Sequence, residues 1–454
     1  MTDTPGVDTN ADETKLVAFV EKLMGGRVVN LTRQPRWRPA WFLDVEKNGE
    51  IIHLHARGDR KSNVVPFPEL KREADIMEVL GQQGVMVPHI YGYCPDPDAI
   101  IMESIRGTRN VAEAASDEER RDISRQYIKA VAAMHRVPIA PFDERGIALP
   151  QRVEDIQLAG LNAYYPLYLR VKKKPEPLVE FALAWIRRNI PTHRTLPAFC
   201  QYDSGQFLFE NGKITGLYDF EFAMICDPMV DLATMRMRES YEPLGDKFPN
   251  VIANYEAASG EPVDDATLIF HNVIFSTVAI GQFCGALVSP TPGDPHAVYI
   301  EWDISLRRVL VTILAEALKL NIADPEQLDA KPAPVPAFLR MMEDAVARIP
   351  TSDEMAALQK SETERLVEYQ IVTAQYGAAL DARSLDEAAQ ILGFRPESIS
   401  AMDAALEAHV QQAGPGEDEK LLRFFHAQVM RDVQVYGPTR IGHSAQNVYL
   451  PPLR

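Results

Sequence analysis

The strongest constraint on how this chain folds is a tight hairpin with an aspartate just outside each end. Two short β-like runs, 206–210 and 213–218, are joined by Asn211-Gly212, a dipeptide that strongly favours a two-residue β-turn. Asp203 precedes the first run and Asp219 follows the second. Because an antiparallel pair returns the chain to the end at which it started, the two carboxylates are expected to lie near one another.

Two neighbouring carboxylates suit the transfer of a phosphoryl group. One orients and deprotonates an attacking hydroxyl, while the other holds magnesium against the phosphates. Gln206, at the start of the hairpin, offers an amide oxygen as a further magnesium ligand. The competing interpretation is that Asp203 and Asp219 only form turns, which is the commoner role of aspartate at strand ends.

Composition excludes several other classes of protein. The chain has 454 residues, 46% of them hydrophobic, which predicts two or three domains with large cores. Its net charge of −17 argues against a protein whose main task is to hold nucleic acid. The most apolar stretch, 268–288, contains His271, Asn272 and Gln282 and is expected to be a buried core helix rather than a membrane span. We therefore expect a soluble, cytoplasmic protein with neither nucleic acid nor a membrane as partner.

Strand signals dominate before residue 105 and helical signals after it. The predicted early elements are a helix over 14–24, a hairpin of 41–47 and 50–57 around Asn48-Gly49, a helix over 69–80 and a buried strand over 99–103. A proline-rich segment, 331–336, separates the C-terminal segment from the rest of the chain. In that segment, Ser384 and Glu387 form a capping-box signature that predicts the start of a new helix.

Taken together, the central segment resembles the aminoglycoside phosphotransferase-like family, which includes choline kinase-like small-molecule kinases. The resemblance rests on an ordered series of motifs: Gln201-Tyr202-Asp203, Gln206, Asp219-Phe220-Glu221 and Asp227-Pro228-Met229-Val230-Asp231-Leu232-Ala233. It implies an α+β, bilobal protein-kinase-like fold with a small β-rich N-lobe, a mostly helical C-lobe and, here, a C-terminal all-helical extension. It also implies ATP or GTP and Mg²⁺ as cofactors.

The same resemblance assigns roles to individual residues. Asp203 would be the catalytic base, and Asp219, assisted by Gln206, the metal ligand. Asp227 and Asp231 would be structural, anchoring the loop and capping the next helix.

In the family, a strand cation pairs with a helix glutamate and steadies the nucleotide phosphates. Glu73 is the expected glutamate, and Arg57 is preferred to His55 as the cation because only arginine is always charged. The segment 101–105 resembles the hinge that binds adenine through backbone groups, which points to Glu103 and Ile105.

The sequence departs from the family pattern in the phosphate loop and before the catalytic aspartate. Residues 31–41, where the loop is expected, contain no glycine, so backbone amides cannot easily approach phosphates. Gln201 and Tyr202 replace the family's His-Gly. The loop contains three arginines, Arg33, Arg36 and Arg38. Two interpretations stay open: the loop is a solvated basic loop, or these side chains bind a phosphate or an anionic group of the substrate.

The function that this resemblance implies is transfer of the γ-phosphoryl group of ATP or GTP to a hydroxyl of a small molecule. An arginine instead of a lysine at position 57 favours the branch of the family that is associated with acyl-CoA dehydrogenases. The acceptor is therefore expected to be an apolar alcohol or a hydroxyacyl thioester. Helices within 139–200 and 230–345 would build the acceptor pocket. The alternative is a catalytically impaired, pseudokinase-like binding or regulatory protein.

The predicted domains are a disordered leader (1–13), a nucleotide-binding N-lobe (14–105), a catalytic and acceptor-binding C-lobe (106–350) and a helical extension (351–454). The apolar faces of the extension leave three roles open: packing on the large lobe, covering the substrate cleft, or forming a homodimer interface.

Overall fold

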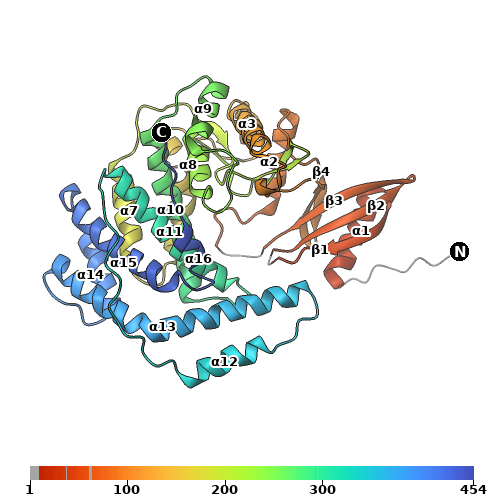
Figure 1. Ribbon diagram of the computed structural model, residues 1–454. Coiled ribbons are helices and arrows are strands. Elements are labelled where there is room, and N and C mark those ends of the chain that lie inside the picture. Colours follow the sequence, from red (N-terminus) through yellow and green to blue (C-terminus); the bar gives the residue numbers. More distant parts are fainter. Residues whose placement is uncertain (1–9, 37, 61–63, 292) are drawn as a thin grey trace. The chain divides into compact units, whose positions relative to one another are not determined.

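The computed structural model describes residues 10–36, 38–60, 64–291 and 293–454 (Figure 1). Its contacts divide the chain into two compact units, each built from separate stretches of sequence. The first comprises 1–149, 197–231 and 244–262, and the second comprises 150–196, 232–243 and 263–454. The division at residues 105 and 350 that the sequence suggests is a different one and stays a prediction.

A five-stranded antiparallel sheet forms the start of the first unit, with strand order β1-β2-β3-β5-β4. Its hairpin turns at Asn48-Gly49 as predicted, and Arg57 near the end of the second hairpin strand lies opposite Ile100 in the neighbouring strand. The strands are β1 (Arg27–Arg33), β2 (Ala40–Lys47), β3 (Glu50–Gly58), β4 (Ile90–Pro95) and β5 (Asp98–Glu103).

The two faces of this sheet have different neighbours. Helix α1 (Ala11–Met24) packs Leu16 and Val20 against one face, where Leu54 and Ala56 of β3 are fully buried. Side chains alternate along a strand, so Arg57 projects from the opposite face, where it meets Glu73 of helix α2 (Leu70–Gln82). The pleat of β3 therefore separates the apolar core from the charged site.

Helix α1 begins earlier than the sequence predicted. The side chain of Asn10 accepts the N–H groups of Asp12 and Glu13, and Glu13 accepts the N–H of Asn10 in return. Glu13 also accepts the indole N–H of Trp41 at 2.9 Å. The prediction of a disordered leader is thus wrong for residues 10–13, because a capping box and a buried hydrogen bond hold them; residues 1–9 lie outside the described part of the chain.

The predicted aspartate-flanked hairpin is present as β7 (Phe207–Glu210) and β8 (Lys213–Leu217). Its turn residues, Asn211 and Gly212, have φ values of 51° and 72°, as a two-residue turn of this kind requires. The other elements of the first unit are η1 (Val111–Glu113), α3 (Asp117–Met134), α4 (Ala140–Asp143), β6 (Ala198–Cys200), β9 (Met224–Cys226) and α9 (Phe248–Ser259), and α8 (Met229–Arg238) begins in this unit and ends in the other.

Helices are the only regular secondary structure in the described residues of the second unit. Its long central helix, α10 (Asp265–Val288), is apolar enough to cross a membrane, but 83% of that apolar window is buried inside the protein. The prediction of a core helix is confirmed. The remaining helices are α5 (Val153–Gln157), α6 (Ala159–Val171), α7 (Pro177–Arg188), α11 (His296–Ala317), α12 (Ala337–Ala347), α13 (Glu354–Leu392), α14 (Ile399–Val410), η2 (Pro415–Glu417), α15 (Asp418–Tyr436) and α16 (His443–Asn447).

The predicted helix start at Ser384 is wrong. Ser384 lies inside α13, a single helix of 39 residues, and is 6% exposed. Glu387, the second residue of the presumed capping box, instead forms an ion pair with Arg431 of α15. The helix ends at Gly393, which adopts a left-handed conformation.

The predicted fold class is confirmed: a small antiparallel sheet precedes a mostly helical remainder, and the C-terminal extension is helical.

Candidate active site

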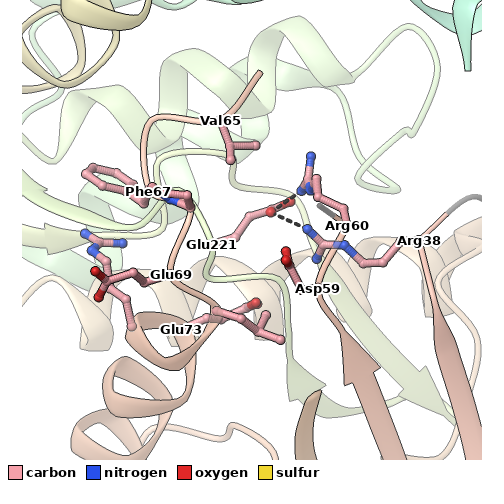
Figure 2. A pocket seen from close by; sticks show the side chains of 11 residues that line it. Arg38, Asp59, Arg60, Val65, Phe67, Glu69, Glu73 and Glu221 are labelled. Atoms are coloured by element: carbon pink, nitrogen blue, oxygen red, sulfur yellow. Dashed lines mark hydrogen bonds and ion pairs between the residues drawn. The ribbon is translucent and has the colours of Figure 1, made fainter. Parts of the chain in front are cut away.

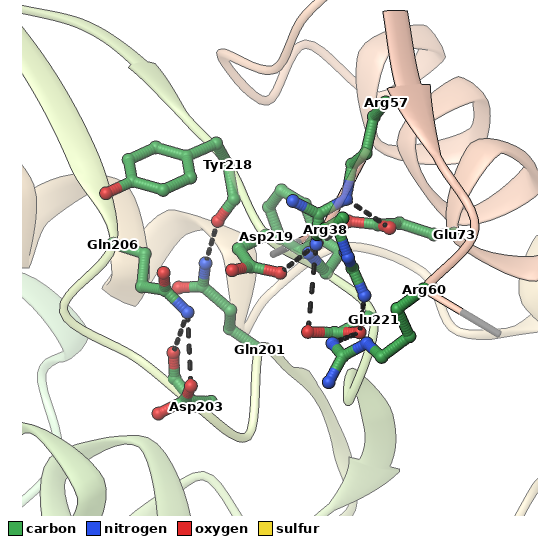
Figure 3. A network of polar contacts seen from close by, with 11 residues as sticks. Arg38, Arg57, Arg60, Glu73, Gln201, Asp203, Gln206, Tyr218, Asp219 and Glu221 are labelled. Carbon is green, nitrogen blue, oxygen red and sulfur yellow. Dashed lines mark hydrogen bonds and ion pairs between the residues drawn. The ribbon is translucent and has the colours of Figure 1, made fainter. Parts of the chain in front are cut away.

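The centre of the site is the guanidinium of Arg57, which is 6% exposed (Figure 3). Its Nε donates to Oε2 of Glu73 at 2.9 Å, and its Nη2 donates to Oδ1 of Asp219 at 2.5 Å. The other oxygen of Glu73 accepts the backbone N–H of Phe220 at 3.0 Å. One helix carboxylate therefore connects the strand cation with the loop that carries Asp219.

The electrostatics of this network fix the charge of each group. Burial would raise the pKa of Asp219, but Arg57 and the neighbouring arginines lower it to about 2. Burial and the charge of Arg57 lower the pKa of His55 to about 4. At neutral pH, Asp219 is therefore ionised and His55 uncharged, which favours Arg57 over His55 as the strand cation.

Asp203 and Gln206 lie on the other side of the site (Figure 3). The amide nitrogen of Gln206 donates to the backbone oxygen and to Oδ2 of Asp203, both at 3.2 Å. Gln201 donates through Nε2 to the backbone oxygen of Tyr218, the residue before Asp219, at 2.6 Å. The two glutamines thus lie between the segments that carry the two aspartates.

The oxygen groups gathered here suit magnesium. Carboxylates of Asp203 and Asp219 and the amide oxygen of Gln206 are the hard ligands that Mg²⁺ prefers. In addition, Oε1 of Gln201 is buried and has no hydrogen-bond partner among the described residues, as expected for an oxygen that faces a ligand-binding space. The residues present therefore fit a magnesium ion bound together with phosphates.

Arg38 and Arg36, both from the glycine-free loop, have different environments. Arg38 is 3% exposed, and its Nη2 donates to Oε2 of Glu221 at 2.6 Å. Arg38 is therefore not a solvated side chain. The side chain of Arg36 is exposed, and phosphate binding by Arg36 stays a prediction.

Two residues of the network were missed by the sequence reasoning. Glu221 pairs with Arg38 and Arg60, and one of its oxygens lies 3.7 Å from Arg57. The signals were present, since Glu221 is the second acid of the Asp-Phe-Glu motif and Arg60 lies three residues after Arg57. The sequence alone does not assign either residue to the site, because the ion pairs that place them there join segments far apart in the chain.

Arg38, Arg60 and Glu221 also line a cleft beside the start of α2 (Figure 2). Its empty volume is about 320 Å³, including the part open to solvent. Nη1 of Arg38 is buried and has no hydrogen-bond partner in the described part of the chain. The cleft therefore continues the charged network rather than forming a separate site.

The predicted hinge follows β5. The N–H of Glu103 is already used, because it donates to the backbone oxygen of His89 at 2.8 Å. Ile105 lies beyond the strand, and its peptide groups make no backbone hydrogen bond within the described residues. Of the two predicted positions, Ile105 is the one whose N–H and C=O remain available for a base.

A buried ion pair holds the loop that carries Asp203. Asp231 accepts the backbone N–H groups of Gln201 and Tyr202 at 3.0 and 2.8 Å and pairs with Nε2 of His135 at 2.9 Å. Nδ1 of His135 contacts the hydroxyl of Tyr255 at 2.8 Å. This supports Tyr202 at a φ of 69°, a conformation that L-residues seldom adopt.

His135 and Asp231, together with Cys200, have ligand atoms within 4.8 Å of one another, as in a metal site. Both ring nitrogens of His135 and both oxygens of Asp231 already have protein partners. The cluster is therefore a hydrogen-bond network that positions a loop. Asp227 supports the same segment by accepting the N–H of Met229 at the start of α8.

The ion-paired carboxylate network around Arg57 thus lies next to the aspartate-flanked hairpin. Among protein families, the model described as "Phosphotransferase enzyme family" matches residues 41–267 of this chain. The chain belongs to this family.

Several solved structures are similar in fold. A protein from Ralstonia eutropha JMP134, described as a candidate aminoglycoside phosphotransferase, is 17% identical with a TM-score of 0.52, over 68% of this chain and 99% of that one. A macrolide 2'-phosphotransferase type I is 17% identical with a TM-score of 0.47, over 70% and 100% of the two chains. The aminoglycoside phosphotransferase APH(4)-Ia in complex with ADP and hygromycin B is 13% identical with a TM-score of 0.44, over 60% and 91%. No curated protein matches the chain.

The His135–Asp231 pair predicts a pH-dependent stability. Burial opposes the charged imidazole, but Asp231 and Cys200 raise its pKa to about 10. A raised pKa means that the stabilisation is complete below pH 6.5 and is lost as the pH rises towards 10. Replacing His135 by Gln should lower the free energy of unfolding by about 3 kcal/mol at pH 6, and the difference from the wild type should shrink towards pH 10, as measured by urea unfolding.

His53→Gln is the matched control, because His53 pairs with Asp44 at the surface with 51% and 30% of the side chains exposed. Its effect should stay below about 1 kcal/mol. A difference for His135→Gln that does not change between pH 6 and pH 10 would show that His135 carries no charge in the folded protein.

Proposed function

We propose that this protein transfers the γ-phosphoryl group of ATP, or of GTP, to a hydroxyl of a small molecule. The observation that carries the proposal is the joint placement of Arg57, Glu73 and Asp219, since a strand cation, a helix glutamate and a metal-binding aspartate are the parts that phosphoryl transfer by kinases requires. Membership of the phosphotransferase family supports the same reaction. The proposed location is the cytoplasm.

In the proposed mechanism, Asp203 accepts the proton of the acceptor hydroxyl and orients its oxygen towards the γ-phosphorus. The amide nitrogen of Gln206, which donates to Asp203, fixes the carboxylate for this task. Asp219 and Gln206, with the free oxygen of Gln201, would hold magnesium, which supplies neutralisation of the charge on the phosphates. The bonds exchanged are one P–O bond formed to the acceptor and one broken to the nucleotide.

Arginine side chains would bind the phosphates in place of a glycine-rich loop. Arg57 is fixed by Glu73, and Arg38 keeps Nη1 free while Nη2 is bound to Glu221. A planar guanidinium binds phosphate oxygens in pairs, so this arrangement replaces the backbone amides that residues 31–41 cannot offer. Ile105 would bind the base through its backbone.

The proposed acceptor is an apolar alcohol or a hydroxyacyl thioester. Support comes from the resemblance of the sequence to the branch with arginine at the strand position. A screen of alcohols and hydroxyacyl thioesters, with release of nucleoside diphosphate as the readout, identifies the acceptor; aminoglycosides and macrolides serve as comparison substrates.

A second candidate function is favoured by one observation, the direct pair between Arg57 and Asp219. If this pair persisted with nucleotide present, Asp219 would not bind metal, and the protein would act as a pseudokinase-like binding or regulatory protein. Calorimetric titration with Mg·ATP and Mg·GTP separates the two, since the proposed enzyme must bind at least one of them.

Replacement of Asp203 by Asn tests the catalytic base. Phosphoryl transfer should fall by about 10²–10⁴-fold, because the amide cannot accept the proton, while the dissociation constant for Mg·ATP should change less than about threefold. Initial rates and calorimetry give the two values. Asp117→Asn, at a surface position where 74% of the side chain is exposed, should leave both unchanged; retained transfer in Asp203→Asn would exclude Asp203 as the base.

The Arg57–Asp219 pair predicts that metal binding depends on nucleotide. Free Mn²⁺, used as a paramagnetic substitute for Mg²⁺, must compete with the guanidinium for Asp219, whereas phosphates offer the guanidinium another partner. In electron paramagnetic resonance titrations, Mn²⁺ should bind at least about tenfold more tightly in the presence of ADP, beyond its affinity for ADP alone. Equal binding with and without ADP would contradict this account.

The side-chain phosphate site predicts that Arg38→Ala weakens Mg·ATP binding by about tenfold or more, as loss of one charge-assisted contact does. Arg33→Ala is the matched control, since Arg33 ends β1 and its guanidinium makes no contact with Glu221 among the described ion pairs. Calorimetry gives the affinities, and circular dichroism checks the fold. Equal affinities for the wild type and Arg38→Ala would remove Arg38 from the nucleotide site.

A further inference from the structure

Helix α12 carries an uncovered apolar face, here called the α12 stripe. Its members recur at intervals of three or four residues, so they lie on one side of the helix and just beyond its end. The exposed fractions of the four large side chains lie between 46% and 64%. The stripe consists of Phe338, Met341, Met342, Ala345 and Ile349.

The side of α12 next to the stripe packs against helix α13. Leu339 and Val346 are 8% and 9% exposed, and Leu339 packs against Val367 and Ile371 of α13. Lys360 of α13 donates to the backbone oxygens of Ala347 and Ile349, at 2.7 and 2.9 Å. The helix is therefore fixed to α13 and presents the stripe as a preformed surface.

The stripe is too continuous to be ordinary surface. Single exposed apolar residues are normal, but several on one face of a three-turn helix form a patch of the kind found at interaction sites. Its ridge of large side chains with the small Ala345 among them matches the way in which one helix packs against another.

The charges beside the stripe distinguish between two possible binding partners, a lipid surface and a protein helix. Arg340 and Arg348 are balanced by Glu343 and Asp344, and the whole chain carries a net charge of −17. An amphipathic helix that binds an anionic lipid surface needs an excess of basic residues on its polar face. The α12 stripe lacks that excess, so a protein helix fits better than a membrane.

We propose that the α12 stripe is the two-fold interface of a homodimer, in which α12 of one copy lies antiparallel to α12 of a second. Two-fold contacts use the same patch on both copies, and a single exposed stripe satisfies this requirement. In an antiparallel pair, Asp344 of each copy lies opposite Arg348 of the other copy, so that an acid faces a base on both sides of the two-fold axis. The sequence left open a homodimer interface in the C-terminal extension (351–454). The proposed interface lies in α12, the helix just before that extension.

The size of the stripe sets the strength of the dimer. A stable complex buries about 800 Å² on each partner, and an 11-residue helix offers less. The dissociation constant is therefore expected to be on the order of micromolar, and the dimer should dissociate on dilution.

Analytical ultracentrifugation of the full chain across micromolar concentrations tests the proposal. The wild type should shift from monomer to dimer, whereas Phe338→Glu combined with Met341→Glu should remain monomeric, because each copy would bury two unpaired charges in the interface. Phe394→Glu is the control, since Phe394 is 57% exposed but lies outside α12. A wild type that stays monomeric at all concentrations, or a dimer that survives the double substitution, overturns the proposal.

Charge exchange tests the antiparallel register. Asp344→Arg alone should weaken dimerisation, because it places like charges together, and Asp344→Arg with Arg348→Asp should restore it. If the double exchange is as weak as the single one, the helices do not pair in this register.

Cysteine cross-linking locates the interface directly, because all four native cysteines are buried. Ala345→Cys, in the stripe and next to the two-fold axis, should give a disulfide-linked dimer on mild oxidation, whereas Ala347→Cys, on the other side of the helix and also exposed, should not. Co-sedimentation with vesicles of phosphatidylcholine and phosphatidylserine should show no binding. Vesicle binding that Phe338→Glu abolishes would assign the stripe to a membrane instead and overturn the dimer.

Discussion

The guanidinium of Arg57 makes two ion pairs at once, to Glu73 on α2 and to Asp219 after β8. Glu73 in turn accepts the N–H of Phe220, so strand, helix and loop meet at a single buried charge. A lysine has one nitrogen and cannot make this flat, two-sided contact. Removing either carboxylate would take one of two direct partners from a buried charge, which is costly. The position of Asp219 therefore depends on this arginine.

Around this centre, the proposed phosphate contacts come from side chains rather than from backbone amides. A glycine-free loop cannot bring its amides close to phosphates, but its Arg38 is buried and bound to Glu221 beside the site. The loop that carries Asp203 is also held by a buried ion pair, because Asp231 accepts two of its N–H groups and is paired with His135. Both features make the site dependent on ionised groups and so sensitive to their replacement.

Much of this arrangement was predictable, and the exceptions share a cause. Asn211-Gly212 and the flanking aspartates predicted the hairpin because turn chemistry is local. Glu221 and Arg60 were missed because their meaning comes from partners more than 150 residues apart in the chain. Ser384 was misread because a capping signature worth about 1 kcal/mol yields to the burial of a continuous helix face. Local signals fail where tertiary burial outweighs them.

The sequence by itself determined the class of the protein, since the order of Asp203, Asp219 and the acidic motifs after them is a property of the chain alone. It also determined the antiparallel hairpins, whose turns need particular residues whatever surrounds them. Only the tertiary structure decided the partners of each arginine and which face of α12 remained uncovered. Ion pairs and buried faces depend on distances between segments remote in sequence, and no local preference encodes those distances.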